Sequence, residues 1–409
     1  MAQKKVSKRK VKKAVKAVKK LPAPLIVVLA LLIVAAIVVV VILNKDKIKE
    51  YFNKPTNTTI TRHALVQGEG DLIVHYVDIG QGDCILIDLP DGDEMLIDCG
   101  CKGVTKSYDT VIKPYLIEYV EDMTIEYVVL THTDEDHVSY LDNVIDDFQV
   151  SNIYMPYILA APGTSSQPKA NAQAKIDALD QTKVALFQDP DTIDTIVYAN
   201  FFISALSEPN CEIHFNMDDN ATTTNNVIVA EDNSYSITFI CPTAEFYENN
   251  HLNNAHAINA VSPVIILEYN YRRMVFTGDC NAYYKNDGSL KTNEGNEWFM
   301  VERIKTLYGN EGLDCDVLKV AHHGAGEASS NEFLDVIDCE YGVISCGLNN
   351  TYGHPWQEAL DRIHNHNMTI YRTDLNGTIT CTINSAGELI FNMEDNTPTQ
   401  EQELVGNHE

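Results

Sequence analysis

Basic residues are scarce in most of this 409-residue chain. Ten of its 30 Lys and Arg residues fall within residues 1–20, a segment without any acidic residue. Since the whole chain carries a formal charge of −28, the ten positive charges of that segment leave −38 for residues 21–409. A polypeptide this acidic repels polyanions at long range and lacks the basic footprint of most nucleic-acid-binding domains. Four cations remain as candidates for a local basic groove: Arg272, Arg273, Lys319 and Arg372.

Polar side chains are absent between Leu25 and Leu43, a run of nineteen apolar residues. At ~1.5 Å per residue, this run approaches the ~30 Å hydrocarbon core of a bilayer. No small-x-small cleavage site follows it, as a signal peptide would require, and a buried core helix usually keeps a polar face. The preceding basic residues predict a single-pass cell-membrane protein with a cytoplasmic N-terminus and an extracytoplasmic domain. We expect the basic tail to lie on anionic lipid headgroups, with a nucleic-acid-binding arm as the alternative.

No Cys-x-x-Cys pair occurs among the ten cysteines. An even number of cysteines in an exported domain permits disulfides, but the sequence does not give the pairing. Several cysteines lie inside apolar strand-like runs, including Cys84 and Cys241. We therefore expect most of them to be buried free thiols.

Composition divides the chain into segments. We expect a basic tail (1–24), a transmembrane helix (25–43), a polar stalk (44–70), a folded domain (71–393) and an acidic polar tail (394–409). Within the domain, β-rich runs such as residues 71–80 and 126–130 alternate with helical patterns such as 107–119 and 296–308. That alternation predicts a layered α/β fold. Residues 160–235 are rich in Asp, Asn and Thr and break the rhythm, which predicts a surface insertion beside the site.

The strongest chemical signal follows the strand-like run at 126–130. An H-x-D-x-D-H cluster places four metal-binding side chains within six residues, namely His132, Asp134, Asp136 and His137. A loop at the carboxyl end of a strand can turn alternate side chains toward one point, as such a site requires. A solvated acidic loop is the alternative interpretation of this segment.

Three further polar loops follow apolar strand-like runs. Asp279 lies in a Thr-Gly-Asp turn, where a carboxylate can bridge two ions about 3.5–4 Å apart. His322 and His323 follow the run at 316–321, and His354 lies in a Gly-His-Pro turn after the run at 341–345. A lone histidine is usually structural, but four such loops at strand ends favour a metal site. The chain has no Gly-x-Ser-x-Gly motif, which argues against a serine nucleophile.

In order and spacing, these motifs resemble the metallo-β-lactamase-fold hydrolases of the ComEC type, the hydrolase domain attached to a bacterial DNA-uptake channel and its free-standing relatives. The resemblance also includes DIGQGD (78–83) and LIDCG (96–100) and covers about residues 71–393. It implies an α/β fold, the αββα sandwich, with a binuclear metal site at one edge of its two sheets.

The resemblance also assigns roles to single residues. His132 and Asp134 correspond to ligands of a first metal ion, and Asp136, His137 and His354 to ligands of a second, with Asp279 bridging. His322 and His323 resemble a pair above the metals, of which at least one is expected to act on substrate; Asp136 is also a candidate for catalysis. Asp98 resembles a carboxylate that orients a ligand histidine, and Asp78 belongs to the turn that supports the site.

The sequence departs from the family pattern at several positions. Cys84 and Ala325 replace serines that are usual there, and Asp134 stands where many relatives have histidine. The histidine expected between the first cluster and Asp279 has no clear counterpart, and His251 and His256 are the two candidates.

Two divalent ions would generate a nucleophilic water near neutral pH. Zn²⁺ is the first expectation, and the three carboxylates of the ligand set keep Mn²⁺ or Fe²⁺ as alternatives. The resemblance suggests a phosphodiesterase acting on nucleic acid outside the membrane. Two alternatives stay open: a phosphoesterase on cell-wall substrates such as phosphorylcholine, and a non-catalytic binding protein on a decayed hydrolase fold.

Overall fold

The structure, a computed structural model, describes residues 65–103, 106–187, 193–249, 255–284, 290–291, 296–395 and 406. Among these residues no helix is long and apolar enough to span a bilayer. The predicted basic tail, transmembrane helix and most of the stalk lie outside the described residues, as do His251 and most of the acidic tail.

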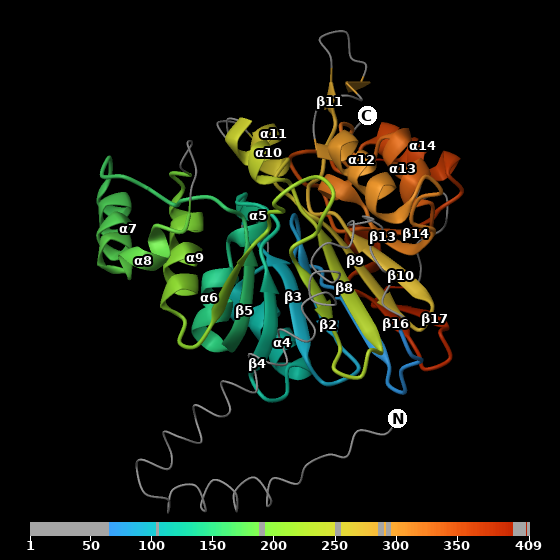
Figure 1. Cartoon of the computed structure of the whole chain (residues 1–409), viewed down its shortest axis with the longest axis horizontal. Coiled ribbons are helices and arrows are strands. Elements are labelled where there is room, and N and C mark those ends of the chain that lie inside the picture. Colours follow the sequence, from blue (N-terminus) through green and yellow to red (C-terminus); the bar gives the residue numbers. More distant parts are fainter. Residues whose placement is uncertain are drawn as a thin grey trace, which may run out of the picture. The chain divides into compact units, whose positions relative to one another are not determined.

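Two sheets form the centre of the folded unit (Figure 1). The first sheet has eight strands in the order β17 (Leu389–Met393), β16 (Ile379–Ile383), β1 (Leu72–Tyr76), β2 (Cys84–Asp88), β3 (Glu94–Cys99), β4 (Thr124–Val129), β5 (Gln149–Met155) and β6 (Glu212–Phe215). The second has seven strands in the order β15 (Thr369–Arg372), β14 (Cys339–Ile344), β13 (Cys315–Lys319), β10 (Arg272–Phe276), β9 (Val264–Tyr269), β8 (Tyr235–Ile240) and β7 (Val227–Val229).

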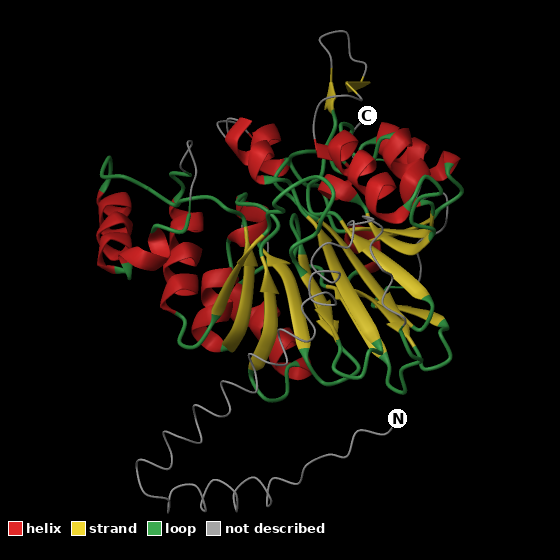
Figure 2. Cartoon of the chain, in the orientation of Figure 1, coloured by secondary structure: helices red, strands yellow, loops and turns green. Residues whose placement is uncertain are grey.

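Helices cover the outer face of each sheet, as Figure 2 shows. Beside the first sheet lie η1 (Tyr108–Ile112), α4 (Lys113–Tyr119), α5 (Glu135–Val138), α6 (Leu141–Asp147), α7 (Gln167–Ala178), α8 (Gln181–Val184) and α9 (Ile196–Ser207). Beside the second lie α12 (Asn296–Tyr308), α13 (Asn331–Ile337) and α14 (Gln357–Asn365). The shorter elements are α10 (Ala244–Asn249), α11 (Ala255–Asn259), η2 (Ala321–Gly324), α15 (Thr373–Asn376), β11 (Tyr283–Tyr284) and β12 (Leu290–Lys291).

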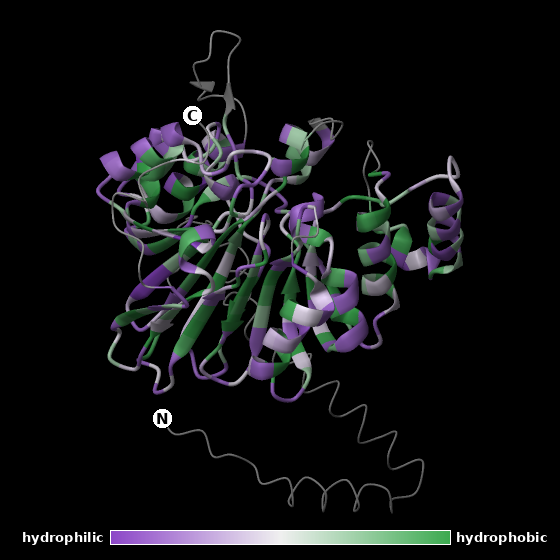
Figure 3. Ribbon diagram, turned by 180° about the vertical axis from the view of Figure 1, so that it is seen from behind, coloured by the Kyte–Doolittle hydropathy of each residue, from purple (hydrophilic) through white to green (hydrophobic). Residues whose placement is uncertain are grey.

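Most residues of the central strands are hydrophobic (green in Figure 3), as expected for sheets that are covered on both faces. In β3, Met95 and Ile97 join the core between the sheets, whereas Leu96 joins the core under the helices. In β10, Met274 lies in the shared core and Val275 packs under α12 and α13. Successive side chains of a strand point to opposite faces of the sheet. The sandwich therefore has three cores, one between the two sheets and one between each sheet and its helices. The predicted α/β sandwich is the fold observed.

Two predicted segment boundaries are wrong. The domain begins before residue 71, because Val66 N donates a hydrogen bond to Asn233 O and Gly68 N donates to Asn270 Oδ1. Residues 160–235 are not only a surface insertion, since this segment supplies β6 at one edge of the first sheet and β7 at one edge of the second. Helix α9 of the same segment also packs into the core.

One disulfide joins Cys315 in β13 to Cys339 in β14, which are opposite each other in the parallel register. The other eight cysteines are free thiols, and all except Cys211 are buried. The expectation of mainly buried thiols is therefore confirmed.

Candidate metal centre

The carboxyl ends of several strands carry the candidate site. Strands β3 and β4 are parallel neighbours, as are β10 with β13 and β13 with β14. Their carboxyl ends therefore meet at one edge of each sheet. Asp98 is within β3, His132–His137 follow β4, Asp279 follows β10, His322 and His323 follow β13, and His354 follows β14.

Four overlapping groups of side chains offer ligand atoms within 4.8 Å of one another. The groups are His132, His137 and Asp279; Asp136, His137 and His323; Asp83, Asp98 and His137; and Asp83, Asp279 and His323. Except for the partly exposed Asp136, all of these residues are buried. Buried histidines and carboxylates at such density are typical of a metal site.

The tautomers of His137 and His323 provide a direct test of fit for a cation. His137 Nδ1 lies 2.8 Å from Asp98 Oδ2, and His323 Nδ1 lies 2.8 Å from the carbonyl oxygen of Ser345. Since both partners accept, both Nδ1 atoms carry the proton in the neutral rings. The two Nε2 lone pairs then face each other across 3.2 Å, and His137 Nε2 also lies 3.2 Å from Asp279 Oδ1. A cation or a trapped proton would relieve this repulsion.

Buried polar atoms without hydrogen-bond partners support the same conclusion. These atoms are His132 Nε2, Asp279 Oδ1, Asp83 Oδ1 and His322 Nδ1. Leaving such a group unsatisfied costs about 1–3 kcal/mol. Several in one cluster indicate a ligand that completes them, so the residues present fit a metal ion.

The electrostatics reflect this crowding. Burial disfavours the charged form of Asp279, but the imidazoles of His137, His322 and His323 outweigh it and hold its pKa well below the usual range. Burial and the neighbouring imidazole of His137 lower the pKa of His132 well below its ordinary value. Asp279 is thus an anion and His132 a neutral donor, the forms that bind metal.

Asp98 orients the cluster. Its Oδ2 accepts hydrogen bonds from His137 Nδ1 and from Thr131 Oγ1, and its Oδ1 accepts one from Thr131 N. A carboxylate behind a ligand imidazole fixes the ring's tautomer and raises its basicity. The geometry agrees with the orienting role predicted for Asp98.

The other predicted residues lie at the margin of the cluster. Asp134 Oδ2 is 4.0 Å from His132 Nε2, and burial together with Asp136 raises the pKa of Asp134 to about 6. The rings of His354 and His322 are 5.3 Å apart between centroids. Neither Asp134 nor His354 joins the ligand groups formed by the described residues.

The paired histidines diverge. His323 is wholly buried and points its Nε2 into the cluster, 3.6 Å from Asp136 Oδ2. The side chain of His322 keeps 16% of its surface exposed, with Nε2 3.5 Å from Asp279 Oδ2 and Nδ1 3.8 Å from Glu327 Oε1. Both residues have positive φ angles, 48° and 53°, which turn the two rings in different directions.

The sequence did not reveal that Asp83 of the DIGQGD turn pairs with Lys319 behind the cluster. In the DIGQGD turn the carboxylate that reaches the cluster is Asp83, whereas Asp78 accepts a hydrogen bond from Gly80 N within the turn and pairs with Lys106. Asp83 forms a fully buried ion pair with Lys319, 2.7 Å between Oδ2 and Nζ. Only tertiary structure joins these two residues, which are 236 positions apart in the chain.

Asn259 lies near the site in the segment between His137 and Asp279, where the family pattern has a histidine. With its amide oriented so that nitrogen faces acceptors, Nδ2 donates to Asp134 Oδ2 at 3.2 Å, and the same side chain lies beside His322. His256, on the same short helix α11, has an exposed side chain. The sequence does not single out Asn259, which lies between Asp134 and His322, because amides are weaker metal ligands than imidazoles.

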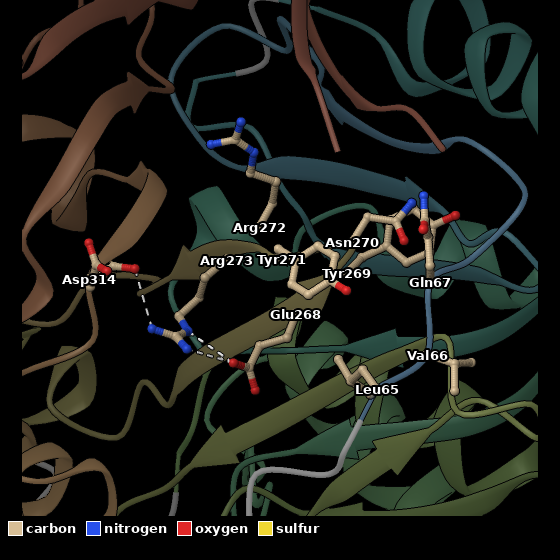
Figure 4. A pocket seen from close by; sticks show the side chains of 10 residues that line it. All are labelled: Leu65, Val66, Gln67, Glu268, Tyr269, Asn270, Tyr271, Arg272, Arg273 and Asp314. Atoms are coloured by element: carbon tan, nitrogen blue, oxygen red, sulfur yellow. Dashed lines mark hydrogen bonds and ion pairs between the residues drawn. The ribbon is translucent and has the colours of Figure 1, made fainter. Parts of the chain in front are cut away.

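The four candidate cations do not form a basic groove at the site. Lys319 is buried against Asp83, and Arg372 is buried against Asp374. Arg272 and Arg273 pair with Asp316 and Glu268 at the amino end of β10, opposite the end that leads to Asp279. They line a cavity of about 300 Å³ at the β9–β10 hairpin, where Figure 4 shows Arg273 directed toward Glu268 and Asp314.

Comparison with known proteins finds a family model over part of the chain. The model of the "Metallo-beta-lactamase superfamily" matches residues 77–203. This stretch is similar to that superfamily. The match confirms the predicted superfamily, whose site is that of metal-dependent hydrolases.

Two curated proteins are similar over a shorter stretch. "ComE operon protein 3" of Bacillus subtilis (strain 168) and "Competence protein ComA" of Neisseria gonorrhoeae are each 37% identical over 78 residues. The match covers 19% of this chain but only 10% and 11% of those proteins. This likeness agrees with the predicted ComEC-type resemblance, although the chain spans only about a tenth of each relative's length.

Among solved structures, the metallo-beta-lactamase fold protein YhfI from Bacillus subtilis has a TM-score of 0.38, with 78% of this chain and 100% of YhfI covered. Igni18, a metallo hydrolase from the archaeon Ignicoccus hospitalis, has a TM-score of 0.35, with 75% and 98% covered. Both are 11% identical to this chain, too distant to support a conclusion of their own.

Proposed function

We propose that the chain is a membrane-anchored, extracytoplasmic hydrolase of phosphodiester bonds that uses two divalent metal ions and acts like a nuclease. The observation that carries the proposal is the pair of Nε2 lone pairs of His137 and His323, 3.2 Å apart and turned toward Asp279. This arrangement places three electron-pair donors around one point. It suits a bound cation; without one, the carboxylates of Asp279 and Asp98 outweigh burial and raise the pKa of His137, so that a proton takes the cation's place.

The ligand groups suggest how two ions would be held. His132, His137 and Asp279 form one group, and Asp136, His137 and His323 form another. Asp279 also approaches His323 Nε2 to 3.7 Å, so it is the carboxylate placed to bridge. Asp134 and His354 would complete the coordination of the two ions. The bound ions would supply a water of lowered pKa and neutralise negative charge that develops on a phosphoryl oxygen. The mixture of carboxylates and imidazoles accommodates Zn²⁺, Mn²⁺ or Fe²⁺.

His322 is the residue we assign to proton transfer. Of the adjacent histidines it is the one with solvent access, and Glu327 lies near its Nδ1. Its Nε2 lies 3.5 Å from Asp279 Oδ2, so a proton held at Nε2 would lie beside the reacting group. From there the proton can pass to a leaving alkoxide. His323, by contrast, is too deeply buried to touch a substrate.

Phosphodiesters are favoured as substrates by the likeness to two competence proteins. The cavity next to the site argues against choline, because recognition of a quaternary ammonium group uses a cage of aromatic rings. That cavity has one aromatic residue, Tyr352, together with Lys102 and Lys106. The acidic charge of the whole chain remains the main argument against strong nucleic-acid binding and favours short or low-affinity substrates.

Anchoring belongs to the proposal because residues 25–43 lie outside the described part. Its basis is the uninterrupted apolar run with ten basic residues before it. Protease added to intact protoplasts should remove the folded domain from cells. Full protection of the domain would overturn the proposed orientation.

The reaction is tested by incubating the purified, metal-loaded chain with bis-p-nitrophenyl phosphate, single-stranded DNA and p-nitrophenyl phosphorylcholine. We expect hydrolysis of the first two, abolished by a chelator and restored by one of the three metals. Hydrolysis of phosphorylcholine alone would establish the cell-wall alternative. Absence of stoichiometric metal and of all three activities would establish the non-catalytic alternative.

A further inference from the structure

A cavity of about 460 Å³ adjoins the candidate metal centre. Three loops form its walls: the turn after β1 with Gln81, the loop after β3 with Lys102 and Lys106, and the loop after β14 with Asn349 and Tyr352. Its volume is within the range of sites that bind small ligands, roughly 300–1,000 Å³. None of its lining residues belongs to the ligand groups of the metal centre.

Two residues that line the cavity contact residues of the candidate metal centre or its loop. The ring of Tyr352 stacks on that of His354, with centroids 5.5 Å apart and planes 21° from parallel. Lys102 Nζ lies 2.6 Å from Glu135 Oε2, and Glu135 is the residue between Asp134 and Asp136. A substrate chain whose reacting group lies at the metals would therefore extend directly into the cavity.

The lining holds two lysines and two aspartates, and each aspartate is already paired, Asp78 with Lys106 and Asp374 with Arg372. The lysines are the groups placed to contact an anion. Lys102 pairs with Glu135 and Lys106 pairs with Asp78, but the lysine side chains keep 40% and 32% of their surface exposed. Ion pairs that water reaches contribute only about 0–1 kcal/mol. A phosphate can therefore contact both ammonium groups at little cost. In a chain this acidic, two lysines beside the site are a local exception.

Two further groups suit a nucleoside. Tyr352 keeps 43% of its surface exposed, which suits stacking against a base. Gln81 is 4% exposed, and its Oε1 accepts a hydrogen bond from Gly347 N, whereas its Nε2 has no hydrogen-bond partner. A buried amide donor beside an empty volume indicates a missing acceptor.

We propose that this cavity is a nucleotide subsite, which binds the residue next to the scissile phosphodiester of a single-stranded substrate. Lys102 and Lys106 contact the adjoining phosphate, and Tyr352 stacks on the base. The inference rests on the proposed function and adds to it the part of the chain that selects polymeric substrate. Because only two cations contribute, the site contacts a short stretch of the nucleic acid. It needs no wide basic surface on this acidic protein.

The test measures binding separately from hydrolysis. A fluorescent, phosphorothioate-linked octanucleotide is titrated with the full-length, metal-loaded chain at several salt concentrations, and anisotropy reports the dissociation constant. The double variant Lys102→Gln/Lys106→Gln should bind about tenfold more weakly, and its slope of log K against log salt should be smaller by roughly 0.7, since each neutralised phosphate of a single strand contributes about 0.7. Lys102→Arg/Lys106→Arg should restore both quantities.

The matched control is Lys169→Gln/Lys305→Gln. Both lysines are in surface ion pairs, with Asp194 and Glu302, and neither lines the cavity. This variant changes the net charge equally and should bind as the wild type does. Equal binding by wild type and Lys102→Gln/Lys106→Gln, or equal loss in the control, would overturn the subsite. Failure of the proposed function has a different signature, namely intact oligonucleotide binding without hydrolysis of any phosphodiester.

Discussion

Lys319 Nζ lies 2.7 Å from Asp83 Oδ2, and both side chains are buried at the rear of the histidine cluster. Asp83 Oδ1 also lies 3.6 Å from His323 Nδ1. The lysine thus neutralises a carboxylate that lies beside the candidate metal ligand His323. A buried charge is tolerated when it is paired, and the loss of one partner leaves the other uncompensated.

Lys319→Met should therefore destabilise the folded domain by about 3–5 kcal/mol. Urea unfolding followed by circular dichroism measures the change. Lys169→Met, which breaks the exposed pair with Asp194, is the control and should cost no more than about 1 kcal/mol. Partial recovery in Asp83→Asn/Lys319→Met would attribute the loss to the uncompensated charge. Wild-type stability in Lys319→Met would show that the pair contributes nothing.

Asp98→Asn should weaken metal binding about 10–100-fold, because His137 loses the acceptor that fixes its tautomer. Competition with a chromophoric chelator gives the affinity. The matched control is Asp88→Asn, which alters a second Asp–His pair, His75 Nε2 with Asp88 Oδ2 at 3.0 Å, outside the metal-ligand groups. Similar affinities for the two variants would remove the orienting role from Asp98.

The two adjacent histidines should separate into different roles. His323→Ala should lose metal, since its Nε2 faces the cluster. His322→Ala should retain metal, lower kcat by about 10²–10⁴-fold and lose one limb of the pH–rate profile, as removal of a general acid does. Metal analysis beside steady-state kinetics distinguishes them. Loss of metal in proportion to activity in both variants would make His322 a ligand instead.

Glu297 should make stability depend on pH. Burial raises its pKa to about 7 from an ordinary 4.5, against the backbone N–H groups of Ser329 and Ser330, which lower it. Between these two pH values the folded chain holds a proton that the unfolded chain has released, so stability falls as pH rises, by on the order of 3 kcal/mol. Urea midpoints from pH 4.5 to 7.5 should show this slope in the wild type. The slope should be smaller in Glu297→Gln, and an unchanged slope would exclude Glu297 as its source.

Local patterns predicted the parts of the site that depend on a strand and the loop after it. His132, Asp136, Asp279 and His323 each follow an apolar run, and the structure brings them together because parallel strands end at one edge. Helix α12 has the bounds 296–308 that its apolar spacing predicts.

Features that depend on distant segments escaped prediction. The Asp83–Lys319 pair joins the two sheets. The sequence makes Lys319 a candidate for a basic groove instead, because it does not display the partner that burial of a lysine requires. Edge strands β6 and β7 lie in a polar segment, where the sheet edge gives little apolar signal. The Cys315–Cys339 disulfide depends on strand register.

The metal content of Asp279→Ala tests the central claim most directly. Asp279 approaches His132, His137, His322 and His323 within 3.8 Å and is the carboxylate placed to bridge. Elemental analysis of the wild type should find two equivalents of divalent metal. The variant should retain neither ion and lose hydrolysis of bis-p-nitrophenyl phosphate by orders of magnitude, with the fold preserved by circular dichroism. Two equivalents in Asp279→Ala, or none in the wild type, would contradict a binuclear centre at these residues.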